Sequence, residues 1–204
     1  MISNLSVIHP NVKLGKNCTI EEFVIIGAPP LGSNAGELET IIGDNAVIRS
    51  HTVIYAGNII GDNFQTGNKA NLRELNEIGN NVSIGTLSVV EHHVKIGNNV
   101  RIHTQVFIPE YTVLDDECWV GPNVVLTNAK YPNSPTAKAN LRGVHLRKKA
   151  IIGANSTILP GVIIGECAIV GAGSVVTKDV MAGLVAAGNP AKIVNRTSAL
   201  PYSI

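Results

Sequence analysis

The sequence predicts an all-β fold in which short parallel strands wind into a triangular prism, with three six-residue sides in each turn. An aliphatic residue recurs every six positions along most of the chain, and a glycine recurs every 18 positions at one corner. Aromatic residues make up only 4% of the chain although 45% of the residues are hydrophobic. The core must therefore be narrow and filled by aliphatic side chains.

The six-residue period is carried by isoleucine, leucine and valine. It comprises Ile8, Leu14, Ile20, Ile26, Ile42, Ile48, Ile54, Ile60, Leu72, Ile78, Ile84, Val90, Ile96, Ile102, Ile108, Leu114, Val120, Leu126, Ile152, Ile158, Ile164, Val170 and Val176. The phase holds without slipping from residue 42 to residue 126, where Thr66 is the one polar member of the series. Each hexad also carries a small or β-branched residue four places later, such as Val82, Val100 and Val124. This pattern fits neither the helical period of 3.6 nor the two-residue alternation of a simple strand.

The longer period indicates how the hexads close into turns. Gly43, Gly61, Gly79 and Gly97 each follow an aliphatic residue and lie 18 residues apart. The strings Ile-Gly-Asp-Asn and Ile-Gly-Asn-Asn place turn-forming residues there, because Gly and Asn tolerate the left-handed backbone region. Three hexads therefore make one turn, which pairs with the next turn at about 4.8 Å, the spacing of neighbouring strands.

The regular phase breaks twice, at about residues 28–40 and 129–150. Both stretches are rich in Pro, Gly, Asn, Ser or Thr, so we expect loops extruded from the prism, and long loops on a regular scaffold often carry function. A disordered insertion is the alternative for the second stretch. Nothing in the composition marks a boundary, so residues 1–204 are expected to form one domain with coils at about 8–127 and 150–194.

Charge and composition limit the partners and the compartment that we expect. The 16 basic and 15 acidic residues are scattered and give a net charge of +1, which argues against nucleic acid and anionic membranes as partners. The N-terminus lacks the features of a secretion signal, and no segment is apolar enough to span a bilayer. We expect a cytoplasmic protein with no metal site, whose three separated cysteines are reduced thiols.

The string Ala-Gly-Asn-Pro-Ala-Lys at residues 187–192, together with the hexads, resembles the hexapeptide-repeat acyltransferases over nearly the whole chain. The resemblance implies that the prism is a left-handed parallel β-helix, a handedness that the period alone does not reveal. It also implies a homotrimer that uses acetyl-CoA as co-substrate and a sugar-like acceptor. Both substrates would bind at the boundary between subunits.

Acyl transfer from a thioester needs a base for the acceptor's proton, and histidine is the natural candidate. The 18-residue turn places Glu74 and Glu110 next to His92 on the two neighbouring turns, where a carboxylate would orient the imidazole and stabilise its protonated form. The string Val-Glu-His-His-Val-Lys-Ile-Gly at residues 90–97 resembles the catalytic segment of UDP-N-acetylglucosamine O-acyltransferases and of bacillosamine-type sugar N-acetyltransferases. The resemblance implies His92 as the general base. Those relatives carry an acid at the next place, where this chain has His93.

Four further residues are candidates for binding the acceptor. His103 follows an inward aliphatic residue and lies near glycines of both neighbouring turns, which leaves room for a ligand. Residues 120–132 resemble maltose and galactoside O-acetyltransferases, with Tyr131 in place of their catalytic histidine. The overall resemblance is closer to the nucleotide-linked 3-amino-sugar N-acetyltransferases, which share a Gly-Pro and Thr-Asn pattern that here includes Asn128. The acceptor-positioning asparagine pair of those relatives is replaced here by Thr104 and Gln105.

The same resemblance places acetyl-CoA along the C-terminal turns, where small residues allow a close approach to the backbone. The small residues in this lane are Gly153, Ala154, Gly171 and Ala172. Lys178 and Lys192 are candidates for binding the phosphates of CoA, with ordinary surface charge as the alternative.

Taken with the resemblance, the sequence predicts an acetyl-CoA-dependent acetyltransferase that acts on a sugar, preferably on the amine of a nucleotide-linked amino sugar. Sugar O-acetylation and a non-catalytic trimeric scaffold are the alternatives. A γ-class carbonic anhydrase shares the prism but needs three converging histidines for zinc, and His103 is the single further histidine near the His92–His93 pair.

Overall fold

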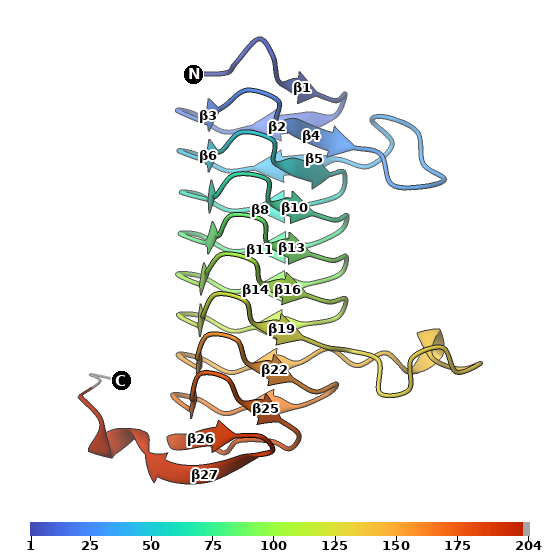
Figure 1. Cartoon of the computed structure of the whole chain (residues 1–204). Helices are drawn as coiled ribbons and strands as arrows, with labels where there is room; N and C mark the ends of the chain where they lie inside the picture. Colours follow the sequence, from blue (N-terminus) through green and yellow to red (C-terminus); the bar gives the residue numbers. More distant parts are fainter. Residues whose placement is uncertain (202–204) are drawn as a thin grey trace.

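The computed structural model describes residues 1–201, which form coils stacked along one axis, with their strands in three sheets (Figure 1). Sheet A contains β3 (Thr19–Ile20), β6 (Val47–Ile48), β9 (Gln65–Thr66), β12 (Ser83–Ile84), β15 (Arg101–Ile102), β18 (Trp119–Val120), β21 (Ile151–Ile152), β24 (Ile169–Val170), β26 (Leu184–Gly188) and β27 (Ala191–Arg196). Sheet B contains β1 (Val7–Ile8), β4 (Ile25–Ala28), β7 (Val53–Tyr55), β10 (Asn71–Leu72), β13 (Val89–Val90), β16 (Phe107–Ile108), β19 (Val125–Leu126), β22 (Thr157–Ile158) and β25 (Val175–Val176). Sheet C contains β2 (Val12–Leu14), β5 (Thr40–Ile42), β8 (Ile59–Ile60), β11 (Glu77–Ile78), β14 (Lys95–Ile96), β17 (Val113–Leu114), β20 (His145–Leu146) and β23 (Ile163–Ile164).

The chain visits sheets B, C and A in turn, and each strand pairs in parallel with the strand one coil later. Val89 pairs with Phe107, and Val90 pairs with Ile108, so one coil takes the 18 residues that the glycine spacing indicates. The prediction of an all-β, left-handed parallel β-helix with three hexads per coil is confirmed. The antiparallel hairpin of β26 and β27 ends the prism, and the short 3₁₀ helix Thr197–Ala199 follows it.

The interior of the prism is a column of aliphatic side chains, as the six-residue period predicts. Ile54, Leu72 and Ile108 are completely buried, and the residues four places after each aliphatic one, such as Val82, line the same interior. The polar member of the series is satisfied inside the protein, because the Thr66 hydroxyl accepts a hydrogen bond from the Arg49 backbone amide at 3.0 Å. In residues 1–201, every buried side-chain nitrogen or oxygen has a hydrogen-bond partner.

The corner between sheets C and A shows why the glycines and asparagines recur there. The left-handed conformation is adopted by the asparagines, with φ of 57° at Asn81 and Asn99, and not by the glycines that precede them. Of the two residue types expected to tolerate this conformation, asparagine adopts it at this corner and glycine does not. A Cβ atom at Gly79 would lie 2.8 Å from the Asn98 Oδ1 atom of the next coil, so glycine is required there by close stacking.

The two extruded loops occupy the positions at which the six-residue phase breaks. The first connects β4 to β5, and the second connects β19 to β20 and contains the 3₁₀ helix Lys138–Asn140. The second loop ends earlier than the expected residue 150, because Val144 and Leu146 already fill the core and β20 pairs with β17. The single-domain interpretation of residues 1–204 stays a prediction, and its last three residues lie outside the described part.

Two further observations concern membrane-spanning helices and the thiols. Among residues 1–201, no helix has the length and apolar character needed to cross a membrane. Cys18, Cys118 and Cys167 are free thiols, and burial raises the pKa of Cys118 to about 12. A thiol with such a pKa stays protonated at neutral pH, so Cys118 acts as a packing residue.

The ladder of corner asparagines provides a test of the stacking. Asn63 donates to the Asn81 side-chain oxygen at 2.8 Å, and Asn81 donates to Asn99 at 3.0 Å. We expect Asn81→Ala to lower the free energy of unfolding by about 1–2 kcal/mol, because it loses both hydrogen bonds and puts alanine in a left-handed conformation. Chemical denaturation would measure this change.

Asn81→Gly is the matched control, because glycine removes the same hydrogen bonds without a backbone penalty. We expect it to be less destabilising than Asn81→Ala. Equal losses in the free energy of unfolding for the two variants would show that the left-handed backbone conformation does not contribute to the destabilisation by alanine.

Candidate active site at one edge of the prism

Both extruded loops of the chain lie at one edge of the prism, between sheets B and C. Each loop follows a strand of sheet B, and Figure 1 shows them projecting on the same side. The regular corners between the two loops include residues 73–76, 91–94 and 109–112. We call this strip edge BC.

The candidate base lies in a column of polar side chains on edge BC. Glu74, His92, Glu110 and Asn128 occupy the same place in four successive coils, and no bulge interrupts the pairing between them. His92 Nε2 lies 3.6 Å from Glu110 Oε1. Asn128 Nδ2 donates to Glu110 Oε2 at 2.6 Å, which fixes the other carboxylate oxygen. The 18-residue register thus places His92 between the two glutamates as expected, and Glu110 is the one with which it pairs.

The two glutamates differ in their surroundings. Arg73 Nε and Nη2 donate to the Glu74 carboxylate at 2.8 and 2.9 Å, and Arg73 Nη1 lies 3.5 Å from Glu91. Burial opposes the ionisation of Glu74, but the hydrogen bond from Arg73 and the charges of Arg73 and His92 outweigh it, so the pKa of Glu74 lies below its usual value. Glu74 is therefore an ionised partner of Arg73, and Glu110 is the carboxylate left to interact with His92.

His93 directly contacts the candidate base. Its Nδ1 lies 2.8 Å from Nδ1 of His92, and the two rings meet edge to face at 83°. The ring of Tyr111, one coil later, lies 5.8 Å from His93 and 6.2 Å from His92. His93 and Tyr111 both adopt the left-handed conformation, with φ of 57° and 65°, which turns these large side chains outward at the corners.

The second loop covers a cavity of about 530 Å³ next to this column. Its lining includes the cations Lys130 and Arg142 together with Tyr131, and no carboxylate among the described residues. The loop returns to edge BC at Arg142, whose backbone amide donates to the Asn128 carbonyl at 2.8 Å. Asn128 and Tyr131, both expected to bind the acceptor, therefore lie on the same edge as His92.

His103 and Gln105 lie on a different edge, between sheets A and B, which we call edge AB. The His103 ring packs against Trp119 with centroids 4.6 Å apart, and Arg101 Nε donates to His103 Nε2 at 3.2 Å. Burial and the charge of Arg101 lower the pKa of His103. Trp119 and Arg101 thus fill part of the space beside His103, and a groove of about 220 Å³ lined by Gly85, His103 and Thr104 remains open, as the small neighbouring residues predict. Within one chain, His103 and Gln105 do not share a corner with His92.

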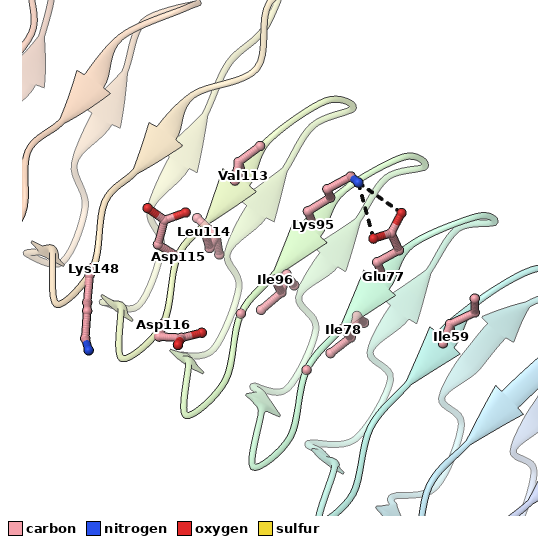
Figure 2. Close-up of a pocket in the computed structure, with 12 residues that line it drawn as sticks. Ile59, Glu77, Ile78, Lys95, Ile96, Val113, Leu114, Asp115, Asp116 and Lys148 are labelled. Carbon is pink, nitrogen blue, oxygen red and sulfur yellow. Dashed lines mark hydrogen bonds and ion pairs between the residues drawn. The ribbon is translucent and has the colours of Figure 1, made fainter.

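A shallow groove of about 690 Å³ lies on the outer face of sheet C (Figure 2). Figure 2 shows Lys95 paired with Glu77 across neighbouring coils, at 3.1 Å, with Ile59 and Val113 on either side. No histidine, hydroxyl or cysteine lines this groove among the described residues. Its polar lining consists of charged side chains such as the Lys95–Glu77 pair, and the column that contains His92 lies on edge BC.

Two family profiles match the sequence of this chain. The profile described as "Bacterial transferase hexapeptide (six repeats)" matches residues 77–110 and 143–178, and that described as "Hexapeptide repeat of succinyl-transferase" matches residues 30–56. The matched segments therefore carry the repeats of hexapeptide transferases. The first match includes both His92 and Glu110. No curated protein matches the sequence significantly.

Several solved structures share the fold of this hexapeptide-repeat protein. The UDP-N-acetylglucosamine acyltransferase of Bacteroides fragilis is 20% identical, with a TM-score of 0.65 over 100% of this chain and 79% of the other. That of Francisella novicida is 19% identical, with a TM-score of 0.65 over 98% and 71%. That of Campylobacter jejuni is 19% identical, with a TM-score of 0.57 over 98% and 76%. At this identity the likeness extends to the fold alone.

The residues expected to bind CoA in this hexapeptide-repeat protein are divided between two edges. The small residues at 153–154 and 171–172 follow β21 and β24 and therefore lie on edge AB. A Cβ atom at Gly153 would lie 2.8 Å from the Ala172 Cα atom, so coil stacking alone already requires that glycine. Lys192 pairs with Ala187 near edge AB, whereas Lys178 follows β25 on edge BC. In residues 1–201, no group of three or more His, Cys, Asp or Glu side chains is arranged to hold a metal ion.

Sequence reasoning missed several members of the site. Arg73, which neutralises Glu74, and Tyr111, which packs on the histidine pair, were not candidates. The 18-residue register contains a signal for Tyr111, because it places this residue one coil after His93. The hydrogen bond of Asn128 to Glu110 follows from the same arithmetic.

The interaction of Arg73 with Glu74 predicts a pH dependence of stability. A carboxyl whose pKa is lowered on folding stabilises the protein above its ordinary value of 4.5, and this contribution is lost as the pH falls through the folded value. Arg73→Gln removes the hydrogen bond that lowers the pKa of Glu74. We therefore expect its Tm to fall less steeply than that of the parent below about pH 4.5.

Lys95→Gln is the matched control, since it removes an exposed ion pair with Glu77 on the neighbouring face. Its Tm should follow the parent at every pH, because such pairs contribute little. Parallel curves of Tm against pH for the parent and Arg73→Gln would contradict the conclusion that Arg73 lowers the pKa of Glu74.

Proposed function

We propose that this hexapeptide-repeat protein is an acetyltransferase that transfers an acetyl group from acetyl-CoA to a sugar, with the amine of a nucleotide-linked amino sugar as acceptor. The observation that carries the proposal is the His92–Glu110–Asn128 column at a corner flanked by two extruded loops. A transferase fold supplies the class of reaction, and this column supplies the acid–base group that the reaction needs.

The column suits the proton balance of direct transfer. The acceptor amine attacks the thioester carbonyl carbon, a C–N bond forms, and the C–S bond breaks to release CoA. The nitrogen loses a proton in this process, and we propose that His92 takes up the resulting charge. Glu110 lies 3.6 Å from the ring, where its negative charge stabilises the imidazolium.

The cavity under the second loop favours an acceptor that carries phosphate. Lys130 and Arg142 line it without an opposing carboxylate among the described residues, and an arginine binds phosphate oxygens through two parallel hydrogen bonds. Lys130 Nζ lies 5.5 Å from the centre of the Tyr131 ring, and we propose that a base or sugar stacks on the opposite face of that ring. A free sugar would bring no negative charge to either cation.

The distribution of residues over two edges favours assembly of the site from two copies of the chain. Edge AB, with the small-residue lane, and edge BC, with His92, border the same sheet and are separated by its width. The outer face of sheet B is largely apolar and includes Val89, Phe107 and Val125. In a three-fold assembly with sheet B turned inward, edge BC of one protomer lies beside edge AB of the next. We therefore propose a homotrimer.

In this assembly acetyl-CoA would bind along edge AB, over residues 153–154 and 171–172, with its thioester facing His92 across the boundary. Lys192 lies near edge AB and Lys178 on edge BC, so both would reach one CoA only across that boundary. His103 and Gln105 on edge AB would then face the acceptor bound at edge BC. We place the protein in the cytoplasm, where its free thiols would stay reduced.

Turnover tests the proposal directly. We expect CoA release from acetyl-CoA in the presence of UDP- or dTDP-linked amino sugars, measured with a thiol reagent. His92→Ala should lower kcat by at least about 100-fold, the usual loss for a missing general base, while the assembly stays intact. His145→Gln is the control, since His145 bonds Asp115 at 2.9 Å on the outer face of sheet C and should not affect turnover.

Turnover of hydroxyl sugars alone would show O-acetylation instead. Absence of CoA release with every acceptor would favour a non-catalytic scaffold and overturn the proposal.

The loop cavity provides a second test, through the Michaelis constants. Lys130→Gln and Arg142→Gln should each raise the KM for the nucleotide-linked acceptor by about 10-fold, the scale of one charge-assisted hydrogen bond, with little change in kcat. Lys138→Gln is the control, because Lys138 lies in the same loop and does not line the cavity. A rise in the KM for acetyl-CoA alone would assign the cavity to the phosphates of CoA.

A further inference from the structure

We infer that His93 is the residue that accepts the proton from the acceptor, and that His92 and Glu110 form a relay behind it. This inference deepens the proposed function and rests on it. It starts from the contacts of the two nitrogens of His92: Nε2 faces Glu110 at 3.6 Å, and Nδ1 faces His93 Nδ1 at 2.8 Å. Both nitrogens of the expected base are therefore directed at protein groups.

Glu110 decides which nitrogen of neutral His92 carries the hydrogen. A carboxylate attracts an N–H group and repels a ring lone pair, so the hydrogen resides on Nε2, the nitrogen nearest Glu110. Nδ1 of His92 then carries the lone pair. Because it lies 2.8 Å from His93 Nδ1, it accepts a hydrogen bond from that nitrogen, which must carry a hydrogen.

The charge of Glu110 near His92 Nε2 and the hydrogen bond between the two Nδ1 atoms together leave the lone pair of His93 on Nε2. His93 is exposed at its corner, whereas the side chain of His92 is only 26% exposed. Tyr111 packs against the His93 ring from the following coil and limits its orientation. The accessible basic nitrogen of the cluster is therefore Nε2 of His93.

The charged groups around the pair favour a positive charge on His92 once a proton arrives. Glu110 faces it from the following coil, and Glu74 contributes a negative charge from the preceding coil that Arg73 partly offsets. Glu91 lies in the same coil and is also engaged by Arg73. His93 has no carboxylate at a comparable distance among the described ion pairs, so the charge is better accommodated on His92.

The relay conserves protons and charge. The nitrogen of the acceptor passes its proton to Nε2 of His93, and His93 passes its Nδ1 proton to Nδ1 of His92. His92 becomes an imidazolium beside Glu110, and the reverse transfers deliver the proton to the departing thiolate of CoA. The products are the acetylated amine and CoA with its thiol, and the protein returns to its initial state.

His93→Asn provides the activity test. Asparagine tolerates the left-handed conformation, and the corner residues Asn81 and Asn99 adopt it with the same φ of 57° as His93, so the variant should fold. We expect kcat to fall by about 100-fold with little change in either KM. His51→Asn is the matched control, because His51 is also exposed at a corner with φ of 63° and lies on edge AB. It should retain the activity of the parent.

The combined variant separates a relay from two independent roles. If His92 and His93 act in one relay, the double variant of His92→Ala and His93→Asn is no slower than the slower single variant. A double variant whose loss in kcat is the product of the two single losses would contradict the relay. Normal turnover of His93→Asn together with an inactive His92→Ala would assign the base role to His92 alone, which overturns this inference and leaves the proposed function standing.

A measurement without turnover tests the tautomers themselves. The ¹⁵N chemical shifts of the histidine rings should show hydrogen on Nε2 of His92 and on Nδ1 of His93 in the neutral protein. Glu110→Gln should redistribute these hydrogens, because a neutral amide no longer holds the hydrogen at Nε2. Hydrogen on Nδ1 of His92 in the parent would overturn the relay even if the enzyme proves active.

Discussion

The parallel pairing of each coil with the next, at a constant offset of 18 residues, is the constraint on which the rest of the structure depends. Backbone hydrogen bonds between short strands fix this offset, because a shift by one residue would turn every interior side chain outward. The aliphatic column, the asparagine ladder and the closely stacked glycines all follow from it. A single coil buries nothing by itself, so stability comes from the repetition.

The same register that builds the core also builds the candidate site. Residues one coil apart are neighbours, so a run of polar residues at one corner becomes a column whose members interact directly. The charged residues on edge BC divide into two groups. Arg73 neutralises Glu74 and approaches Glu91. Asn128 orients Glu110 towards His92. Charge balance along the column thus leaves one carboxylate, Glu110, for the histidines.

The sequence was sufficient for features that depend on the period alone and insufficient for those that depend on side-chain choice. The coil length and the neighbours of His92 followed from counting, since no bulge occurs between residues 74 and 110. Counting could not show that Arg73 binds Glu74, because their contact depends on rotamers of adjacent residues. The end of the second loop was misplaced although Leu146 is in phase with Ile152, since one hexad is too weak a signal beside an irregular segment.

The geometry of a prism also accounts for the proposed separation of proton transfer from ligand binding. A solenoid brings residues together along an edge, through stacked coils, and holds its three edges apart by the width of a sheet. Proton transfer needs contacts of about 3 Å and so belongs to one edge, where His92, His93 and Glu110 meet. Binding two large substrates needs a cleft, which the flat faces do not provide. In the proposed trimer, packing of one prism against another would create such a cleft between edges that a single chain keeps apart, so assembly and catalysis would impose the same requirement on the outer face of sheet B.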